Sequence, residues 1–415
     1  MDPRSLVVVG ASLAGLRAVE AARKAGFDGR ITLVGAEPHL PYDRPPLSKA
    51  YLDAASATEI PVFRSEDVLR TELGVTLRLG EPATGLDTGR RQVVVGGEPI
   101  PYDALVLATG ATARRLPGTD GLRGVHTLRT ADDAVAVRRA LDAGARTVVI
   151  GAGFIGSEVA SAARKRGLDV TVVEALPTPL VRAVGEVMGE ACAWLHHRNG
   201  TVLHCGVQVT GFEGEGRVER VLLSDGGALD ADLVVMGAGA VPATGWLEGS
   251  GLTLDDGVVC DTTLFTGAPG VYAAGDVARW HNPVFGRSMR LEHWTSAAEQ
   301  GAVAARNALD PAAARPYGTV PYFWSDWYDS RIQFVGVPQA DEIRVADGDA
   351  AGEGRCVALY READRLCGAL TVNAPTEIMK YRALITRGAS WQEALTFAEA
   401  RRTARRPTTV PALDR

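Results

Sequence analysis

Two glycine-containing turns of similar sequence occur 141 residues apart, and both have the residue types that bind a dinucleotide. The first reads Val7-Val-Val-Gly10-Ala-Ser-Leu-Ala-Gly15, and the second reads Val148-Val-Ile-Gly-Ala-Gly-Phe-Ile-Gly156. In such a turn the first glycine permits the bend, the second lets the backbone approach a pyrophosphate, and the third lets helix and strand pack closely. The helix that starts there offers free amides to the phosphates. The repeated pattern therefore predicts two bound dinucleotides.

Side chains near both turns complete the expected sites. The second strand of each copy ends in a glutamate, Glu37 and Glu174, and a carboxylate there accepts hydrogen bonds from ribose hydroxyls. Ser12 replaces the second glycine of the first copy; it is small, and its hydroxyl can bond a phosphate oxygen. The residues expected at the phosphates are Gly10, Ser12, Ala14 and Gly15 in the first turn and Gly151, Gly153, Phe154, Ile155 and Gly156 in the second.

Strand–helix–strand units must position these turns. Apolar runs predict the flanking strands at 6–9 and 31–34 in the first unit and at 147–150 and 170–173 in the second, with helices ending at Lys24 and Arg166. Further apolar runs, 103–111 and 232–240, close the two units. A last run, 270–278, predicts a strand that leads through Asp276 into a helix, and by itself Asp276 is typical of a helix N-cap.

Length, composition and charge limit the class of protein. The chain has 415 residues, which predicts two or three domains. Its net charge of −6 leaves no overall basic surface for nucleic acid. No stretch of about 18 apolar residues predicts a membrane span, and the N-terminus lacks the apolar core of a signal peptide. We therefore expect a cytoplasmic protein with neither a membrane nor a nucleic acid as partner.

The cysteines and histidines do not predict a metal site. The five cysteines are Cys192, Cys205, Cys260, Cys356 and Cys367, and no two of them form a C-x-x-C pair. His196 and His197 are adjacent in a predicted helix, where neighbouring side chains point about 100° apart and do not share an ion easily. We interpret these two residues and His204 as a solvated helix end.

Together these segments resemble the two-dinucleotide flavoproteins of the glutathione reductase superfamily, over residues 5–300. The resemblance implies FAD on the first unit, a nicotinamide cofactor on the second, and a ribityl contact from Asp276. Disulfide and peroxide reductases of this superfamily need a redox cysteine early in the chain, whereas the first cysteine here is Cys192. The chain therefore lacks the nucleophile for either chemistry.

Three motifs refine the resemblance. They are Pro41-Tyr-Asp-Arg44-Pro-Pro-Leu-Ser-Lys49, the segment 290–300 (RLEHWTSAAEQ) and Phe323-Trp-Ser-Asp326. They are similar to motifs of the FAD-dependent ferredoxin reductases of the putidaredoxin reductase and rubredoxin reductase type, and the similarity covers nearly the whole chain. It implies hydride transfer from NADH to FAD, and single-electron transfer to an iron–sulfur ferredoxin that supplies a monooxygenase or dioxygenase.

Two other functions stay open. A reduced flavoprotein can instead pass electrons to quinones, dyes or oxygen. A flavoprotein of this type can also act as a redox sensor, in which NADH binding switches dimerisation or partner binding. The sequence predicts a monomer or a weak dimer.

Lys49 and Glu158 are the residues of most chemical interest. Only four of the 44 basic residues are lysines, and a lysine in a proline-rich turn indicates a need for a compact charge, although a surface lysine fits composition equally well. Glu158 in a first helical turn complements the helix dipole. The resemblance implies that the two form an ion pair beside the reactive nitrogen of the flavin.

The resemblance assigns further residues to the cofactors. For FAD these are Arg44, Ala83, Thr109, Gly110, Arg129, Gly275, Asp276 and Trp294. For the nicotinamide cofactor they are Gly239, Arg182 and Glu174, and the last of these favours NADH over NADPH because it would repel a ribose phosphate. Trp324 and Trp327 fit either packing or electron transfer. Arg279, Arg287 and Arg290 cluster in sequence near the flavin segment and are candidates for ferredoxin docking.

The expected fold class is α/β, with two Rossmann-like dinucleotide-binding domains and a C-terminal α+β domain. The FAD domain is expected at 1–113 and 243–315, the inserted NAD domain at 114–242, and the C-terminal domain at 316–415. In the last we predict strands near 332–335, 357–360 and 366–372 and helices from Pro375 and Trp391. The arginine-rich segment 401–406 is predicted to be a solvated helix end, with a basic docking face as the alternative.

Overall fold

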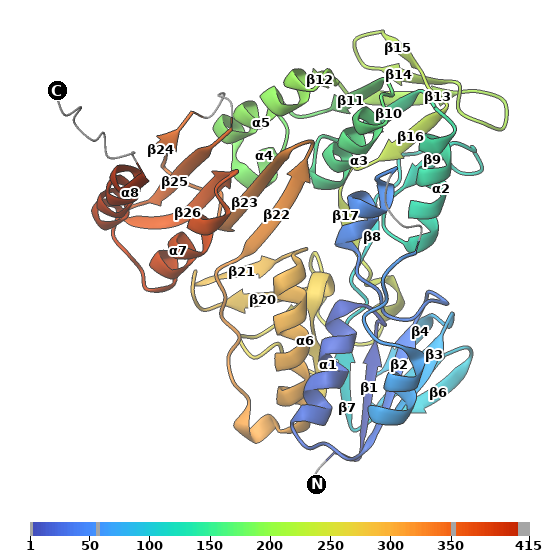
Figure 1. The fold of residues 1–415 in the computed structure, drawn as a ribbon. Helices are drawn as coiled ribbons and strands as arrows, with labels where there is room; N and C mark the ends of the chain where they lie inside the picture. Colours follow the sequence, from blue (N-terminus) through green and yellow to red (C-terminus); the bar gives the residue numbers. More distant parts are fainter. Residues whose placement is uncertain (1–2, 55–58, 350–353, 406–415) are drawn as a thin grey trace, which may run out of the picture.

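The computed structural model describes residues 3–54, 59–349 and 354–405. Two parallel sheets and one antiparallel sheet, each of five strands, make up the main part of the fold (Figure 1). This arrangement confirms the predicted fold class. The domain limits at 113 and 243 and at 316 stay predictions.

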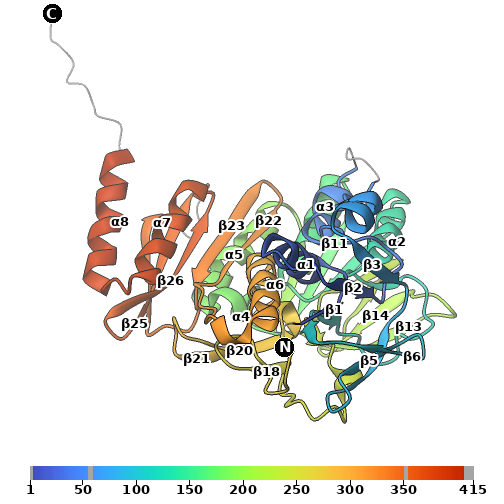
Figure 2. The ribbon, with the colours of Figure 1, turned by 90° about the horizontal axis from the view of Figure 1, so that it is seen from below.

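The first parallel sheet has the order β19-β7-β1-β2-β3. Its strands are β1 (Ser5–Val9), β2 (Arg30–Gly35), β3 (Val75–Leu79), β7 (Ala104–Leu107) and β19 (Val271–Ala273). Every residue of β1 is buried, as expected for a parallel strand covered on both faces. Helices α1 (Leu13–Lys24) and α6 (Trp294–Leu309) lie side by side against this sheet (Figures 1 and 2). A Cβ at Gly301 would lie 2.1 Å from the Ala14 carbonyl oxygen, so the two helices can cross this closely only because residue 301 is glycine.

The second parallel sheet has the order β12-β11-β10-β16-β9. Its strands are β9 (Val125–Thr127), β10 (Thr147–Ile150), β11 (Val170–Glu174), β12 (Val202–Cys205) and β16 (Leu233–Met236). Helices α2 (Ala131–Asp142) and α3 (Phe154–Lys165) pack on it, and α4 (Val181–Val184) and α5 (Glu186–Arg198) follow β11. The two chain passages between the parallel sheets, β8 (Ala111–Ala113) and β17 (Ala240–Pro242), pair with each other.

The C-terminal sheet is antiparallel, with the order β22-β23-β26-β25-β24. Its strands are β22 (Tyr322–Trp327), β23 (Ser330–Gly336), β24 (Glu342–Gly348), β25 (Cys356–Glu362) and β26 (Arg365–Val372), followed by α7 (Pro375–Thr386) and α8 (Trp391–Arg405). The three predicted strands and both helix starts are confirmed. The sequence prediction missed β22 and β24, the two edge strands of this sheet.

Three small sheets complete the fold. They are β4 (Ala83–Asp87), β5 (Gln92–Val95) and β6 (Glu98–Pro101); β13 (Val209–Glu213), β14 (Arg220–Leu223) and β15 (Ala228–Asp230); and β18 (Val258–Cys260), β20 (Ala278–Asn282) and β21 (Arg287–Arg290). The helix expected directly after Asp276 was wrong. A short 3₁₀ turn and then β20 follow it, and the next α-helix begins at Trp294.

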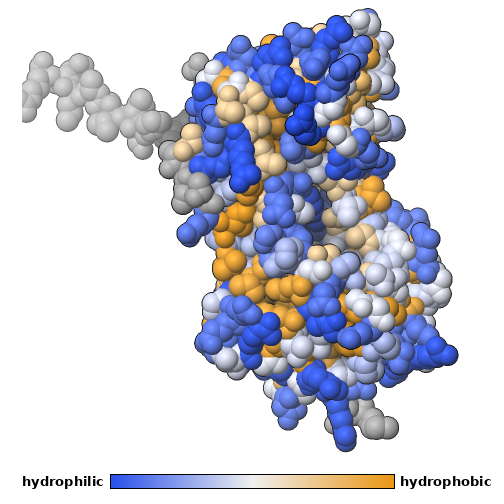
Figure 3. Space-filling model, turned by 90° about the vertical axis from the view of Figure 1, so that its right-hand side faces the viewer, coloured by the Kyte–Doolittle hydropathy of each residue, from blue (hydrophilic) through white to orange (hydrophobic). Residues whose placement is uncertain are grey.

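In the view of Figure 3 the molecule is narrower in its middle than at its two ends. The surface is hollowed at this narrow part, and apolar residues gather around the hollow. In the described part of the chain, no helix is long and apolar enough to cross a membrane.

Candidate functional site

The first glycine turn requires its glycines for steric reasons. Gly10 follows β1 with φ +123°, and a Cβ there would lie 2.0 Å from the Ala108 carbonyl oxygen. A Cβ at Gly15 would lie 1.9 Å from the Gly10 carbonyl oxygen. Ser12 precedes α1 and makes no side-chain cap, so its hydroxyl is free to accept a hydrogen bond from Arg44 Nε at 3.2 Å. The turn thus has the tight geometry expected of a dinucleotide site.

The second glycine turn repeats this geometry. Gly151 has φ +95°, and a Cβ there would lie 2.5 Å from the Gly237 carbonyl oxygen; a Cβ at Gly156 would lie 2.0 Å from that of Gly151. At Gly153, by contrast, the nearest atom to an added Cβ is 3.9 Å away. The space beside Gly153 is open, so a phosphate can approach the backbone there. Phe154 and Ile155 begin α3, and Ile155 is exposed.

Both strand-end glutamates are held in place. Glu37 pairs with Arg44 at 2.5 Å and accepts a hydrogen bond from the Tyr42 hydroxyl at 2.5 Å. Burial raises the pKa of Tyr42, so its hydroxyl stays a donor. Glu174 accepts hydrogen bonds from the backbone N–H groups of Ala152 at 2.7 Å and Leu176 at 2.9 Å. Glu174 is therefore fixed beside the second glycine turn.

The other residues expected at the nicotinamide cofactor lie near the same edge of the second sheet. Gly239 has φ +93° with open space around it, a conformation that favours glycine. Arg182 is exposed on α4, which follows β11.

Several residues expected at FAD come together between β7 and the 3₁₀ turn at Gly275. Asp276 pairs with Arg129 at 2.7 Å, and the Arg129 carbonyl oxygen accepts a hydrogen bond from Arg44. Gly110 has φ +69° and faces Arg129. The Gly275 N–H donates to Gln300 Oε1 at 2.8 Å. Asp276 is thus a side chain with a charged partner rather than a helix cap.

Three more residues expected at FAD have contacts or positions of their own. The hydroxyl of Thr109 donates to the Ala243 carbonyl oxygen at 3.1 Å. Ala83 begins β4 and is half-buried. Trp294 begins α6, and its Nε1 donates to Asp43 Oδ1 at 2.8 Å.

Lys49 and Glu158 form the predicted ion pair, with 2.7 Å between Lys49 Nζ and Glu158 Oε1. The Glu158 side chain is 2% exposed. Two further side chains donate to it, the Ser48 hydroxyl to Oε2 and the Ser325 hydroxyl to Oε1, each at 2.5 Å. The sequence interpretation assigned neither serine a role, although both belong to the motifs on which the resemblance rests.

Comparison with known proteins agrees with this geometry. Residues 4–301 match the pyridine nucleotide-disulphide oxidoreductase family, and residues 322–404 match the reductase C-terminal family. The chain is 37% identical over 384 residues to rhodocoxin reductase of Rhodococcus erythropolis, covering 92% of this chain and 89% of the relative. It is 37% identical over 377 residues to the ferredoxin–NAD(+) reductase component of the biphenyl dioxygenase system of Paraburkholderia xenovorans, covering 90% and 91%.

A solved structure, that of the covalent putidaredoxin reductase–putidaredoxin complex, superposes with a TM-score of 0.88 at 33% identity, covering 97% of this chain and 99% of that one. The chain belongs to the FAD-dependent ferredoxin reductases. This membership makes it an oxidoreductase that uses FAD and a nicotinamide cofactor.

The residues present fit a flavin of this family. His293 precedes Trp294, and its Nδ1 is buried without a hydrogen-bond partner among the described residues. Burial lowers the pKa of His293 to about 4, so the ring is neutral and able to bond a polar ligand atom. An unpartnered buried atom at His293 and open space beside Gly153 are both expected in a chain that folds around bound cofactors.

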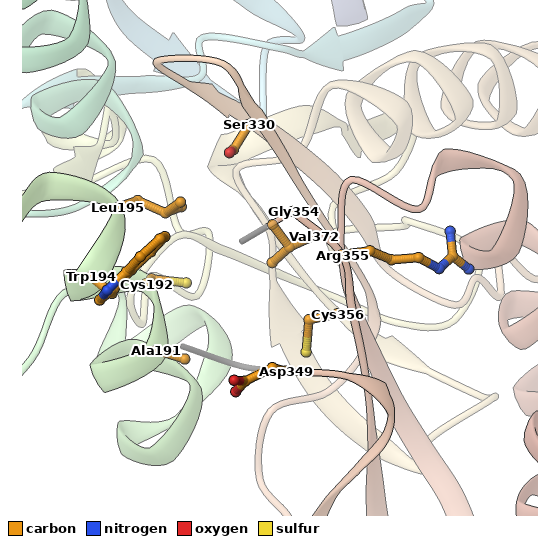
Figure 4. Close-up of a pocket in the computed structure, with 10 residues that line it drawn as sticks. All are labelled: Ala191, Cys192, Trp194, Leu195, Ser330, Asp349, Gly354, Arg355, Cys356 and Val372. Carbon is orange, nitrogen blue, oxygen red and sulfur yellow. The ribbon is translucent and has the colours of Figure 1, made fainter. Parts of the chain in front are cut away.

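All five cysteines are free. Cys192 on α5 and Cys356 on β25 line a small pocket between α5 and the C-terminal sheet (Figure 4). Burial raises the pKa of each thiol to about 12, so neither is a thiolate near neutral pH. These two buried cysteines are therefore unsuited to the dithiol chemistry of the disulfide reductases.

The histidine interpretation was wrong for His196. This residue is fully buried; its Nδ1 bonds the Tyr328 hydroxyl at 2.7 Å and its Nε2 bonds the Ser157 hydroxyl at 3.1 Å. Adjacent helical residues point in different directions, so His197 is exposed while His196 faces the C-terminal sheet. His204 is half-exposed on β12. In the described ranges, no three or more His, Cys, Asp or Glu side chains come together in a group that could hold a metal ion.

The predicted basic surfaces are neutralised in part. Arg279, Arg287 and Arg290 lie on the antiparallel strands β20 and β21, and we call them the β-hairpin arginines. Each has an acidic partner: Arg279 pairs with Asp255, Arg287 with Glu362 at 4.0 Å, and Arg290 with Asp256 at 3.1 Å and Glu292 at 2.7 Å. In the tail, Arg401 binds the buried Glu377 at 2.8 Å and 3.0 Å, so a solvated helix end was wrong for this residue. Arg406 lies outside the described residues.

Proposed function

We propose that the chain transfers electrons from NADH, by way of bound FAD, to an iron–sulfur ferredoxin that supplies an oxygenase. The ion pair between Lys49 and the buried Glu158 carries this proposal, because a lysine held at 2.7 Å by a carboxylate is a fixed positive charge. Such a charge favours electron transfer into a flavin placed beside it. The rhodocoxin and biphenyl dioxygenase relatives, and the solved complex with putidaredoxin, support a ferredoxin as the acceptor.

We infer the division of work among the side chains as follows. The first turn, with Glu37, Arg44, Arg129 and Asp276, holds the FAD. The second turn, with Glu174, holds the NADH. Bound flavin supplies the change from a two-electron donor to one-electron acceptors. The protein binds and orients both groups, and no side chain has to act as acid, base or nucleophile.

Trp324 is our candidate for the side chain nearest the docked ferredoxin. It is half-exposed on the edge strand β22, and its ring lies 6.4 Å from that of Trp294, centroid to centroid, edge to face. Trp327 is fully buried, and its ring lies 4.9 Å from that of His196, which supports packing as its role.

The test is cytochrome c reduction with NADH and a panel of small ferredoxins. We expect at least one ferredoxin to raise the rate above the rate with NADH alone. A rate that no ferredoxin raises would overturn the proposal. Fast reduction of quinones or oxygen without ferredoxin would favour the first alternative, and an NADH-dependent change of assembly in sedimentation would favour the redox sensor. The same sedimentation run tests the proposed monomer or weak dimer.

A further inference from the structure

The Glu158 carboxylate receives hydrogen-bond donors from distant parts of the chain. Glu158 lies on α3, which follows the second glycine turn, whereas Ser48 and Lys49 come from the segment after β2. Ser325 comes from β22 of the C-terminal sheet, whose end lies against α3 (Figure 1). Ser48, Glu158 and Ser325 are all buried, so these donors replace water around the carboxylate.

The direction of the hydrogen bond from Ser325 is fixed by its neighbour Trp327. The indole Nε1 of Trp327 lies 2.9 Å from Ser325 Oγ, and an indole N–H can only donate. The serine oxygen therefore accepts this bond, and its single proton points to Glu158 Oε1. That oxygen also accepts from Lys49, so Ser325 and Lys49 share it.

A second set of contacts holds β22 and α3 in this register. The Tyr328 N–H donates to Ser161 Oγ at 2.5 Å, and the Tyr328 hydroxyl bonds His196, which in turn bonds Ser157. Ser157 and Ser161 lie one turn apart on α3, on either side of Glu158 in sequence. The alignment of Ser325 with Glu158 is therefore built into the packing of the C-terminal sheet.

We propose that Ser325 is a positioning residue for the Lys49–Glu158 pair, and that through it the C-terminal sheet adjusts the charge presented to the flavin. The inference rests on the proposed function, because it takes the pair to lie at the flavin. The Ser325 hydroxyl offsets part of the negative charge on Oε1. Without it Glu158 holds Lys49 more strongly, and less of the positive charge of Lys49 is available to stabilise the reduced flavin.

The test is the midpoint potential of the bound flavin, together with its rate of reduction by NADH, in the holoprotein with Ser325→Ala. Ser325→Ala removes one hydrogen bond to a charged group. We expect this loss to lower the equilibrium constant for flavin reduction about tenfold, which corresponds to a midpoint potential about 30 mV lower. The reduction rate should fall in the same direction. Ser325→Thr keeps the hydroxyl on a strand, where a β-branched residue fits, and should restore both values.

Thr371→Val is the matched control. Thr371 is fully buried on β26 of the same sheet, and its hydroxyl has no partner among the described residues, so both values should stay at those of the parent. A Ser325→Ala potential equal to that of the parent would overturn the inference, as would an equal shift in Thr371→Val. If Ser325→Ala does not retain flavin, Ser325→Cys, of similar shape but a weaker donor, is measured and judged by the same rule.

Lys49→Met separates this inference from the proposed function. If Lys49→Met changes the potential and Ser325→Ala does not, only the role of Ser325 is wrong. If Lys49→Met changes nothing, the placement of the pair at the flavin is wrong, and the inference falls with it. Neither measurement uses a ferredoxin, so neither depends on the outcome of the ferredoxin panel.

Discussion

Replacing Glu174 with glutamine tests our prediction that this carboxylate makes the chain prefer NADH over NADPH. The carboxylate is fixed by two backbone N–H groups, at 2.7 Å and 2.9 Å, one to each oxygen. Each oxygen keeps a second lone pair, so the carboxylate can accept from both ribose hydroxyls. NADPH would bring a phosphate of about two negative charges to this point. No arginine or lysine occurs at 175–181 to offset it, and Arg182 is the nearest basic residue in sequence.

The size of the expected preference for NADH follows from the hydrogen bonds to Glu174 that NADPH would not make. Hydrogen bonds to charged groups contribute about 1.5–3 kcal/mol. A combined loss of about 2.7 kcal/mol corresponds to roughly a hundredfold in catalytic efficiency. We therefore expect kcat/KM for flavin reduction to be about a hundredfold higher with NADH than with NADPH, and Glu174→Gln to reduce this ratio about tenfold, because an amide keeps only one acceptor oxygen.

The assay is stopped-flow reduction of the flavin with each cofactor. Glu186→Gln is the control, because Glu186 is an exposed glutamate in the first turn of α5 and should leave the ratio unchanged. Thermal melting of each variant checks that the turn at Ala152 is intact. Equal efficiencies for NADH and NADPH in the parent protein would refute the reasoning.

Lys49→Met should slow flavin reduction by NADH, whereas Lys24→Met, at the exposed end of α1, should not. FAD should be bound without a covalent link, so acid precipitation should leave all the yellow colour in the supernatant and none in the pellet. If the β-hairpin arginines bind an acidic ferredoxin, turnover should fall as salt shortens the Debye length from about 10 Å to about 3 Å; a flat profile would indicate apolar docking instead. Burial, with a smaller effect of His197, lowers the pKa of His196 to about 3, so below pH 6.5 only the unfolded chain takes up this proton. The free energy of unfolding should therefore lose about 2 kcal/mol from this residue at pH 5, and His196→Gln should show a flatter pH dependence between pH 5 and pH 7.

The glycine turns were predictable because their requirements are local. Gly15 would place a Cβ 1.9 Å from the Gly10 carbonyl oxygen in the same turn, and Gly10 itself has φ +123°, so a short motif contains both of these constraints. The parallel strands were predictable for a similar reason, since a strand covered on both faces reads as a continuous apolar run. Edge strand β24 lacks this signal, because half-buried and exposed residues alternate irregularly along it.

The helix N-cap expected at Asp276 and the solvated end expected at His196 failed for a different reason. Both interpretations used only the neighbouring residues, and both side chains are engaged by partners far away in the sequence. Asp276 meets Arg129, 147 residues earlier, and His196 meets Tyr328, 132 residues later. A pattern that is typical of a helix end gives no information about what packs against that end.

Glu158 combines both situations. Its position near the start of α3 is a local feature, but Glu158 is the fifth residue of this helix, so the first-turn position expected from the sequence was wrong and the helix dipole stabilises it little. Its hydrogen-bond partners are not local, since Ser48 lies 110 residues before it and Ser325 lies 167 residues after it. A buried carboxylate is stable only if its oxygens find donors, so the fold has to bring these segments together before Glu158 can hold Lys49. The ion pair thus depends on the segment after β2, on α3 and on β22 of the C-terminal sheet. This is why we expect a variant in the C-terminal sheet to change the potential of the flavin that we propose to lie beside the pair.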